Sequence, residues 1–205
     1  MSDGGYDEGY SRCPCFWGET PAGMVNAAIK MFESTGKKAA LDLGCGDGKN
    51  ASALARAGFR VLAIDKSEIA ISNAMRNFPA MEVSWLVSDL TEIGGPAEAY
   101  DVVVATGSLH CLSSKEAIER AIAVIQRMTK KSGLNVISSF NDGRQNMDGH
   151  DPEFRPTLLP HDQYLRMYLG WDLLQASSVV QPDVHPHNNI PHTHSITRIL
   201  ARRNA

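Results

Sequence analysis

The chain has 205 residues, of which 43% are hydrophobic and 21% charged, and its formal net charge is -3. This length is enough for one well-buried α/β core but short for two. The absence of a basic block argues against a nucleic-acid partner. No apolar run approaches the roughly 18 residues that a membrane-spanning helix needs, and the acidic, glycine-rich residues 1–10 do not resemble a secretory signal. We therefore expect a cytoplasmic protein, monomeric or homodimeric, whose four cysteines are reduced thiols.

Strand-like and helix-like segments alternate along most of the chain. Residues 1–20 are expected to form a lid segment, in which residues 1–12 are either disordered or lid-like, and residues 21–205 to form a single domain. Apolar runs predict strands over 39–43, 60–65, 83–86, 100–105, 133–140, 171–180 and 194–201. Helical periodicity predicts five helices. One begins at Pro21, one ends before Gly58, one begins at the Ser67 cap, and two span 115–128 and 160–168.

The alternation predicts an α/β fold of the Rossmann-like type. Strands that alternate with helices form a parallel sheet covered by helices on both faces. The last two predicted strands are joined without a helix, so the last strand should be antiparallel. We expect seven strands, mostly parallel, with an antiparallel last strand.

The strongest local signal is the glycine-rich turn over residues 41–48, Leu-Asp-Leu-Gly-Cys-Gly-Asp-Gly. A strand ends there and a helix begins, and glycines let a ligand approach the backbone closely. The spacing is G-x-G-x-G behind Asp42, rather than the G-x-G-x-x-G of dinucleotide sites. Because Asp42 would repel a pyrophosphate, the turn favours a nucleoside cofactor without one, and a nucleotide-dependent oxidoreductase is the weaker interpretation.

Further polar groups follow the next three predicted strands. Asp65 ends the second strand and can accept hydrogen bonds from both hydroxyls of a ribose. Asp89, with the Leu90 backbone N–H, follows the third strand and is placed to meet an adenine, and Thr106 begins a short loop after the fourth. Each residue alone could equally be a helix cap or a loop residue. Together they lie at the carboxyl ends of strands, where open α/β sheets bind ligands.

The segment 41–74 resembles the cofactor-binding half of class I S-adenosylmethionine (SAM)-dependent methyltransferases. The run Leu-Asp-Leu-Gly-Cys-Gly-Asp-Gly-Lys-Asn and the pair Asp65-Lys66 are most similar to the tellurite-resistance (TehB-type) methyltransferases, and weaker similarity extends to 136–142, 164–171 and 199–202. The resemblance implies SAM as cofactor and S-adenosylhomocysteine as product. The cofactor-binding residues that we infer are Asp42, Gly44, Cys45, Gly46, Asn50, Asp65, Lys66, Asp89, Leu90, Thr106 and Trp17.

Methyl transfer is an in-line displacement, so the enzyme mainly aligns the acceptor and excludes water. The chain has little beyond the core, and segments 1–17 and 143–160 have the composition of mobile covers. We therefore expect a small soluble acceptor, namely a metalloid, thiol, amine or carboxylate.

The candidate acceptor-binding residues each have a structural alternative. His110 follows the fourth strand, beside the expected position of the methyl group, but could be a packed core histidine. Asp142 ends the fifth strand, but could form an Asx turn into Gly143. The candidate aromatic walls are Phe16, Trp17 and Tyr164. Trp17 could cover the sulfonium by cation–π contact or could hold a loop against the core.

Residues 185–194 hold four of the seven histidines. If residues 188–191 are the loop of a hairpin, His187 opposes His192, His185 opposes His194, and all four imidazoles share one face. Such a face could bind a transition metal, although two prolines argue against a regular hairpin.

Two functions follow from the histidine segment. In the favoured interpretation it forms the acceptor side of the pocket, with His185 and His187, together with His110, as candidate catalytic residues and His192 and His194 as substrate residues. The alternative is a metal- or metalloid-handling protein of the same fold, in which these four histidines are the candidate metal ligands. A pair at Cys13 and Cys15 could join that site.

Overall fold

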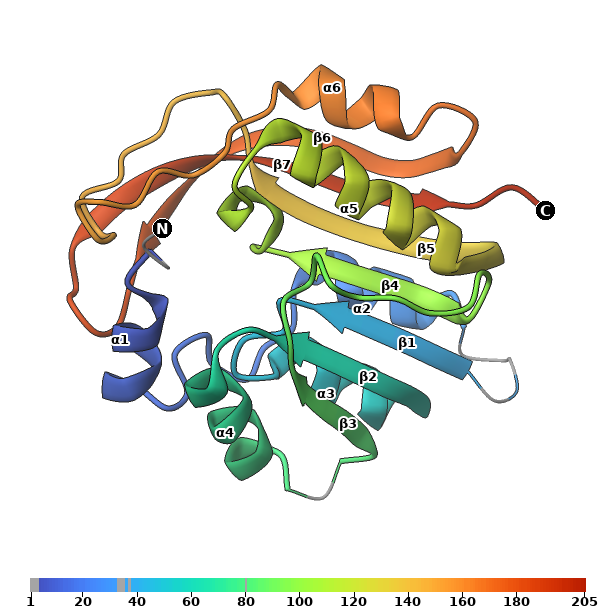
Figure 1. Ribbon diagram of the computed structural model, residues 1–205, viewed down its shortest axis with the longest axis horizontal. Helices are drawn as coiled ribbons and strands as arrows, with labels where there is room; N and C mark the ends of the chain where they lie inside the picture. Colours follow the sequence, from blue (N-terminus) through green and yellow to red (C-terminus); the bar gives the residue numbers. More distant parts are fainter. Residues whose placement is uncertain (1–3, 33–35, 37, 80) are drawn as a thin grey trace.

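The computed structural model describes residues 4–32, 36, 38–79 and 81–205, which form a seven-stranded sheet (Figure 1). The strands are β1 (Lys38–Leu43), β2 (Phe59–Asp65), β3 (Val83–Val87), β4 (Tyr100–Thr106), β5 (Thr129–Phe140), β6 (Asp172–Val184) and β7 (Pro191–Arg202). Their order is β3-β2-β1-β4-β5-β7-β6. The first five strands are parallel, and β7 is antiparallel to both β5 and β6. The predicted fold class, with its antiparallel last strand, is confirmed.

Helices cover both faces of the sheet. They are α1 (Tyr6–Arg12), α2 (Gly23–Lys30), α3 (Lys49–Arg56), α4 (Glu68–Asn77), α5 (Lys115–Met128) and α6 (His161–Met167). One hydrophobic core lies between the sheet and α5 with α6, and a second lies between the sheet and α2, α3 and α4. In Figure 1, α5 lies in front of the sheet and α2 and α3 lie behind it. The alternation of strands and helices in the sequence therefore gives a sheet with a hydrophobic core on each face.

Two helices begin at the serine caps that their sequences contain. The Ser67 hydroxyl accepts a hydrogen bond from the Ala70 amide at 3.0 Å, and the Ser114 hydroxyl accepts one from the Ala117 amide at 3.2 Å. Each bond satisfies a backbone donor that the first helical turn leaves without a partner. The cap at Ser67 is important for the site because α4 begins at Glu68, three residues after Asp65.

All seven strands are longer than predicted, and three of them exceed the prediction by three or more residues. Strand β5 begins at Thr129 rather than at residue 133, because Thr129 is buried and its hydroxyl donates to the Ile125 carbonyl at 2.7 Å, so the strand follows α5 without a loop. Strand β6 continues to Val184, beyond its predicted end at residue 180, and β7 begins at Pro191, before its predicted start at residue 194. Pro182 interrupts the sequence pattern of β6, but an edge strand tolerates proline because one side of its backbone makes no ladder bonds.

Of the two alternatives for residues 1–12, the disordered one is wrong for the part that the structure describes. Residues 1–3 lie outside it, but Tyr6–Arg12 forms α1, which packs against α4. The Asn73 side chain donates to the Tyr10 carbonyl at 2.9 Å, and Ser67 bonds the Asp7 carboxylate. In Figure 1, α1 lies beside α4 and faces the end of the β6–β7 hairpin.

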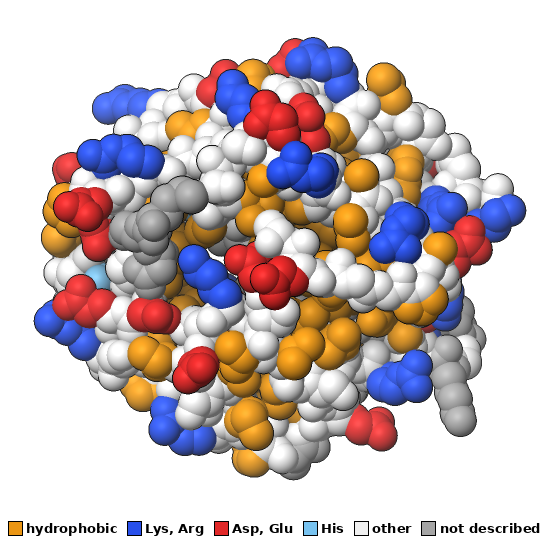
Figure 2. All heavy atoms as spheres, in the orientation of Figure 1, with side chains coloured by type: hydrophobic (Ala, Val, Ile, Leu, Met, Phe, Trp, Pro, Cys, Tyr) orange, Lys and Arg blue, Asp and Glu red, His pale blue; other side chains and the backbone are white. Residues whose placement is uncertain are grey.

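Acidic and basic side chains are interspersed on the face shown in Figure 2, with hydrophobic side chains between them. That face therefore shows no stripe of one charge sign. Of the helices that the structure describes, none is long and apolar enough to cross a membrane.

Candidate cofactor and acceptor site

A cavity of about 630 Å³ lies at the carboxyl ends of the central strands, between the N-terminal segment and the β6–β7 hairpin. Its size is within the usual range of small-molecule pockets, about 300–1,000 Å³. The predicted cofactor residues that line it are Gly44, Cys45, Gly46, Asn50, Asp65, Lys66, Asp89, Leu90, Thr106 and Trp17. The remaining one, Asp42, is buried in β1 and does not line the cavity.

The glycine turn has a backbone that other residues could not adopt without strain. Gly44 and Gly46 have φ values of 67° and 55°, in the left-handed region that favours glycine. A Cβ atom on Gly44 would lie 2.3 Å from the Ser108 Cβ, and one on Gly46 would lie 2.8 Å from the Tyr10 hydroxyl. The turn is therefore packed between the end of β4 and the N-terminal segment, which leaves its remaining side facing the cavity.

The Asp65 carboxylate fastens the turn to the start of α4. One of its oxygens accepts from the Gly46 amide at 2.8 Å, and the other accepts from the Ser67 amide at 3.0 Å. A carboxylate has about four acceptor positions, so two remain for a ligand in the cavity. Burial raises the pKa of Asp65, and the two amide bonds oppose that rise.

Asp42 is a buried carboxylate below the glycine turn. Burial, followed by the charge of Asp65, raises its pKa to about 7, and the nearby Ala51 amide offsets this rise only in part. Among the described residues, neither carboxylate oxygen makes a hydrogen bond of normal geometry. Since a buried polar group without a partner is costly, a water molecule or a cationic ligand group here would stabilise the site.

Two other predicted cofactor residues also have structural roles. Asn50 donates to the Thr106 hydroxyl at 2.9 Å and accepts from the Ala22 amide at 2.9 Å, so it joins β4 to the start of α2. Asp89 accepts from both the amide and the hydroxyl of Thr91, at 2.8 and 2.7 Å. The loop-residue interpretation of Asp89 is thus correct, and the residue lines the cavity as well.

The N-terminal segment covers the cavity through Trp17. Its backbone amide donates to Asp47 at 3.0 Å, its indole N–H donates to the Tyr10 hydroxyl at 3.0 Å, and the Lys49 ammonium lies 5.5 Å from the indole ring centre. Tyr6, Tyr10 and Trp17 all line the cavity. Trp17 therefore holds its loop to the glycine turn and forms a wall of the cavity at the same time.

His110 lies against the cavity and has no polar partner among the residues that the structure describes. Its ring stacks on Phe140 with 3.7 Å between ring centres, and neither nitrogen has a hydrogen-bond partner among the described residues. Burial, with a smaller contribution from His150 and His194, lowers its pKa to about 3. The imidazole is therefore neutral near pH 7, and one of its nitrogens can accept a hydrogen bond from a molecule in the cavity.

Several predicted acceptor residues lie outside the cavity, whereas His110 and His185 line it. The residues outside are Phe16, Asp142, Tyr164, His187, His192 and His194. Tyr164 is fully buried and its hydroxyl donates to Ser139 at 2.8 Å. Asp142 is exposed, and the Asx turn into Gly143 is formed by Asn141, whose side chain accepts from the Gly143 amide at 3.0 Å.

The sequence did not identify the polar residues of β6 and β7 that line the cavity, among them Gln181, Asp183 and Arg198. Their alternate spacing was the available signal, because side chains two apart share a face of a strand. Gln181 and Asp183 were missed because the sixth strand was predicted to end at residue 180, whereas Arg198 lies within the predicted seventh strand and was not considered as a cavity residue.

The hairpin of β6 and β7 forms, but its predicted register is wrong. His194 pairs with Gln181 and His192 pairs with Asp183, whereas His185 lies beyond the end of β6, in the connection to β7. The connection is six residues long rather than four, because it includes a turn in which the Asn189 amide donates to the His185 carbonyl at 2.9 Å. His187 is also in this connection, where its ring stacks on that of His185.

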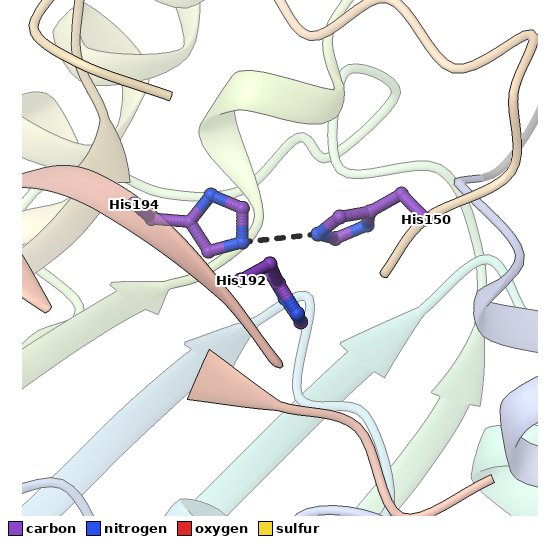
Figure 3. A group of neighbouring side chains, drawn as sticks. All are labelled: His150, His192 and His194. Atoms are coloured by element: carbon purple, nitrogen blue, oxygen red, sulfur yellow. Dashed lines mark hydrogen bonds between the residues drawn. The ribbon is translucent and has the colours of Figure 1, made fainter. Parts of the chain in front are cut away.

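A histidine cluster nevertheless forms, with a member that the sequence did not indicate. His192 and His194 lie on one face of β7, and His150 reaches them from the loop between β5 and α6 (Figure 3). The Nε2 atoms of His150 and His194 are 3.1 Å apart. His150 stands alone in its loop, so no spacing pattern could indicate it.

His185 belongs to a second group of potential metal ligands, which shares His192 with the histidine cluster. Its Nε2 lies 3.8 Å from an Asp183 oxygen, and the two residues form a potential metal-binding group with His192. Cys13 and Cys15 are free thiols and belong to neither group. The prediction that they could join a metal site therefore finds no support in the described residues.

The family comparison agrees with this geometry. Residues 40–133 match the model of the methyltransferase domain, and this region runs from β1 to the beginning of β5. The match covers the cofactor-binding half of the fold and confirms the resemblance to class I methyltransferases stated from the sequence.

This chain matches only part of the length of its curated relatives. A ubiquinone biosynthesis O-methyltransferase of Rickettsia conorii is 32% identical over 114 residues, which are 55% of this chain and 38% of the relative. Hemagglutinin 1 of Eikenella corrodens is 34% identical over 142 residues, 68% of this chain and 46% of that protein. The chain thus spans less than half the length of these relatives.

Solved structures are similar over nearly the whole chain. A structure described by the conversion of a disulfide bond into a thioacetal group during echinomycin biosynthesis has a TM-score of 0.70 and 24% identity, covering 97% of this chain and 90% of that one. TehB from Haemophilus influenzae has a TM-score of 0.71 and 21% identity, covering 89% and 62%. A 1,6-didemethyltoxoflavin-N1-methyltransferase from Burkholderia thailandensis, with bound S-adenosylhomocysteine, has a TM-score of 0.62 and 17% identity, covering 89% and 79%. At these identities the likeness shows the fold.

Proposed function

We propose that the protein transfers a methyl group from SAM to a small soluble acceptor and releases S-adenosylhomocysteine. The observation that carries the proposal is the single cavity that brings the glycine turn, Asp65 and Asp89 together with His110 and His185. The bound S-adenosylhomocysteine in the Burkholderia enzyme of the same fold supports this assignment.

The residues of the cavity fit the parts of SAM. The two remaining acceptor positions of Asp65 suit the ribose hydroxyls, and Asp89 with the Leu90 amide suits the adenine. The glycine turn allows close approach of the methionine part, and Asp42, buried behind the turn with no hydrogen bond of normal geometry among the described residues, suits a water that bridges it to the cavity. When bound, SAM supplies an activated methyl group, and the chain has to align the acceptor and exclude water.

The acceptor end of the cavity favours a nucleophile that needs little help from a base. A histidine whose pKa is lowered to about 3 is a weak base near neutral pH, so His110 is better suited to orient the acceptor than to deprotonate it. Arg198 and Gln181, which bond one another, line the same end. A thiolate, carboxylate or metalloid oxyanion fits this environment better than a protonated amine.

The test is calorimetry with SAM and S-adenosylhomocysteine, followed by turnover measured as S-adenosylhomocysteine formed from metalloids, thiols, amines and carboxylic acids. We expect saturable binding of both nucleosides and turnover with an anionic acceptor. Absence of binding by either nucleoside to the folded protein would overturn the proposal.

A second candidate function, metal or metalloid handling by the same fold, is favoured by the clustering of His150, His192 and His194. Metal content and SAM turnover, measured on the same sample, separate the two. Bound metal without SAM binding would support the second function, and SAM turnover by metal-free protein would support the first.

A further inference from the structure

Three histidine side chains converge in the interior at a place that the proposed methyl transfer does not use. His150, His192 and His194 have relative exposures of 8%, 4% and 1%. Their ligand nitrogens all lie within 4.8 Å of one another. Figure 3 shows the rings of His150 and His194 directed at each other, with His192 next to them.

Neighbouring groups fix the proton on His194. Gln145 donates from its amide nitrogen to the carbonyls of Asn141 and Ser195, at 2.8 and 2.9 Å. Its amide oxygen therefore faces the Nδ1 of His194 at 2.9 Å, and since that oxygen only accepts, Nδ1 carries the proton. The Nε2 of His194 is left with its lone pair, 3.1 Å from the Nε2 of His150.

His192 is held in the same tautomer. Its Nδ1 lies 2.7 Å from the Ile190 carbonyl oxygen, which can only accept, so this nitrogen also donates. Its Nε2 is buried and has no hydrogen-bond partner in the described part of the chain. A buried lone pair without a partner costs free energy unless something binds it.

The nearby His185 repeats the arrangement. Its Nδ1 lies 3.0 Å from the Gly149 carbonyl oxygen, and Gly149 itself packs against the His192 ring, where a Cβ would lie 2.3 Å from Nδ1. Metal-binding histidines usually donate their second N–H to a carbonyl or carboxylate in this way, which orients the ring and fixes the tautomer. Of the three clustered histidines, His192 and His194 thus have the supporting hydrogen bonds of the kind found in metal sites, whereas the Nδ1 of His150 makes no hydrogen bond of normal geometry among the described residues.

We propose that the Nε2 atoms of His150, His192 and His194 bind one transition-metal ion of the Zn²⁺ type. Zn–N bonds are about 2.0–2.1 Å long, so two ligands of a tetrahedral ion lie roughly 3.3–3.4 Å apart, close to the observed 3.1 Å between His150 and His194. Three protein ligands leave a fourth position for water or a further ligand, as in catalytic zinc sites. The ion would join the loop between β5 and α6 to β7.

This site differs from the histidine face that the sequence suggested. It includes His150 and excludes His187, whose Nε2 contacts the Asn188 side chain at 3.2 Å. The inference does not depend on methyl transfer, because metal binding is measured without SAM. The alternative is a hydrogen bond from the Nε2 of His150 to that of His194 with no metal bound.

The test is titration of chelator-treated, tag-free protein with Zn²⁺ and Co²⁺, read by calorimetry and by the visible absorption of tetrahedral Co²⁺. We expect one equivalent to bind, with a rise in unfolding temperature when metal is added. His192→Gln and His194→Gln should lower the affinity by roughly a hundredfold or more, and Gln145→Met, which removes a supporting acceptor, by about tenfold. The matched control is His161→Gln, since His161 contacts Thr197 outside the cluster, and it should leave the affinity unchanged.

Wild-type titration alone can overturn the proposal. If folded wild-type protein takes up no stoichiometric Zn²⁺ or Co²⁺, the cluster is a hydrogen-bonded histidine pair. Equal loss of affinity in His161→Gln and His192→Gln would likewise place the metal elsewhere.

Discussion

The Gly46 amide donates to the Asp65 carboxylate at 2.8 Å, so one side chain at the end of β2 holds the turn that follows β1. The second oxygen of Asp65 accepts from the Ser67 amide at 3.0 Å. This geometry keeps the carboxylate fixed in the cavity wall before any ligand binds. A fixed acceptor loses less conformational freedom on binding than a mobile one.

Asp65→Ala is expected to weaken SAM binding by about 1.5–3 kcal/mol, the range for hydrogen bonds to charged groups. The measurement is calorimetric titration of wild type and variant. Asp142→Ala is the matched control, because Asp142 is exposed outside the cavity, and it should bind SAM as wild type does. Wild-type affinity in a folded Asp65→Ala protein would remove Asp65 from the cofactor site.

Trp17→Ala is expected to lower turnover more than it lowers stability. The indole closes the cavity wall, and loss of a cover admits water and loosens the alignment of acceptor and methyl group. Turnover per folded molecule should fall roughly tenfold or more, and urea unfolding of the same samples measures stability. The turnover of Trp17→Phe, which keeps a ring but loses the hydrogen bond to Tyr10, should lie between that of wild type and that of Trp17→Ala. A large drop in stability with unchanged turnover would leave Trp17 as a packing residue only.

How much the sequence could predict depended on the range of the interactions. The glycine turn and Asp65 were predictable because their spacing and strand–turn–helix context are local. The position of His150 was not, because its loop contacts β7 through tertiary packing around Gly149, which no local pattern encodes.

The predicted register of the hairpin was wrong for a related reason. Hairpin register depends on the length and type of the turn, and residues 185–190 form a wider turn than the histidine symmetry suggested. A shift of this size changes the pairing partner of each histidine. His192 and His194 still share a face because two-residue spacing on a strand does not depend on register.

His185→Asn is expected to lower methyl transfer by about a hundredfold, the cost of a misplaced acceptor, while SAM affinity stays near that of wild type. His185 lines the cavity, and burial lowers its pKa, so its imidazole is neutral and can position the acceptor at the cavity wall. Turnover and calorimetry should be run in chelator, so that loss of metal cannot explain the effect. His161→Asn, outside the cavity, is the control, and equal turnover by the two variants would exclude His185 from the acceptor site.

His110→Phe is expected to make the protein less sensitive to acid. In the folded protein the pKa of His110 is lowered to about 3, whereas the unfolded chain has the ordinary value of about 6.5. Because the unfolded state binds the proton more readily between these values, the contribution of His110 to stability is present above about pH 6.5 and is lost as the pH falls toward 3. Phenylalanine has no such proton and can keep the stacking on Phe140.

Relative to the His110→Phe variant, wild type should therefore lose about 1.4 kcal/mol of unfolding free energy for each pH unit below 6.5, or about 2 kcal/mol at pH 5. The raised pKa of Asp42 acts in the opposite direction, but it is present in both proteins and cancels in the difference. Urea unfolding of both proteins between pH 5 and 8, in the presence of chelator, gives the measurement, and a constant difference across that range would mean that His110 is not held neutral by its burial.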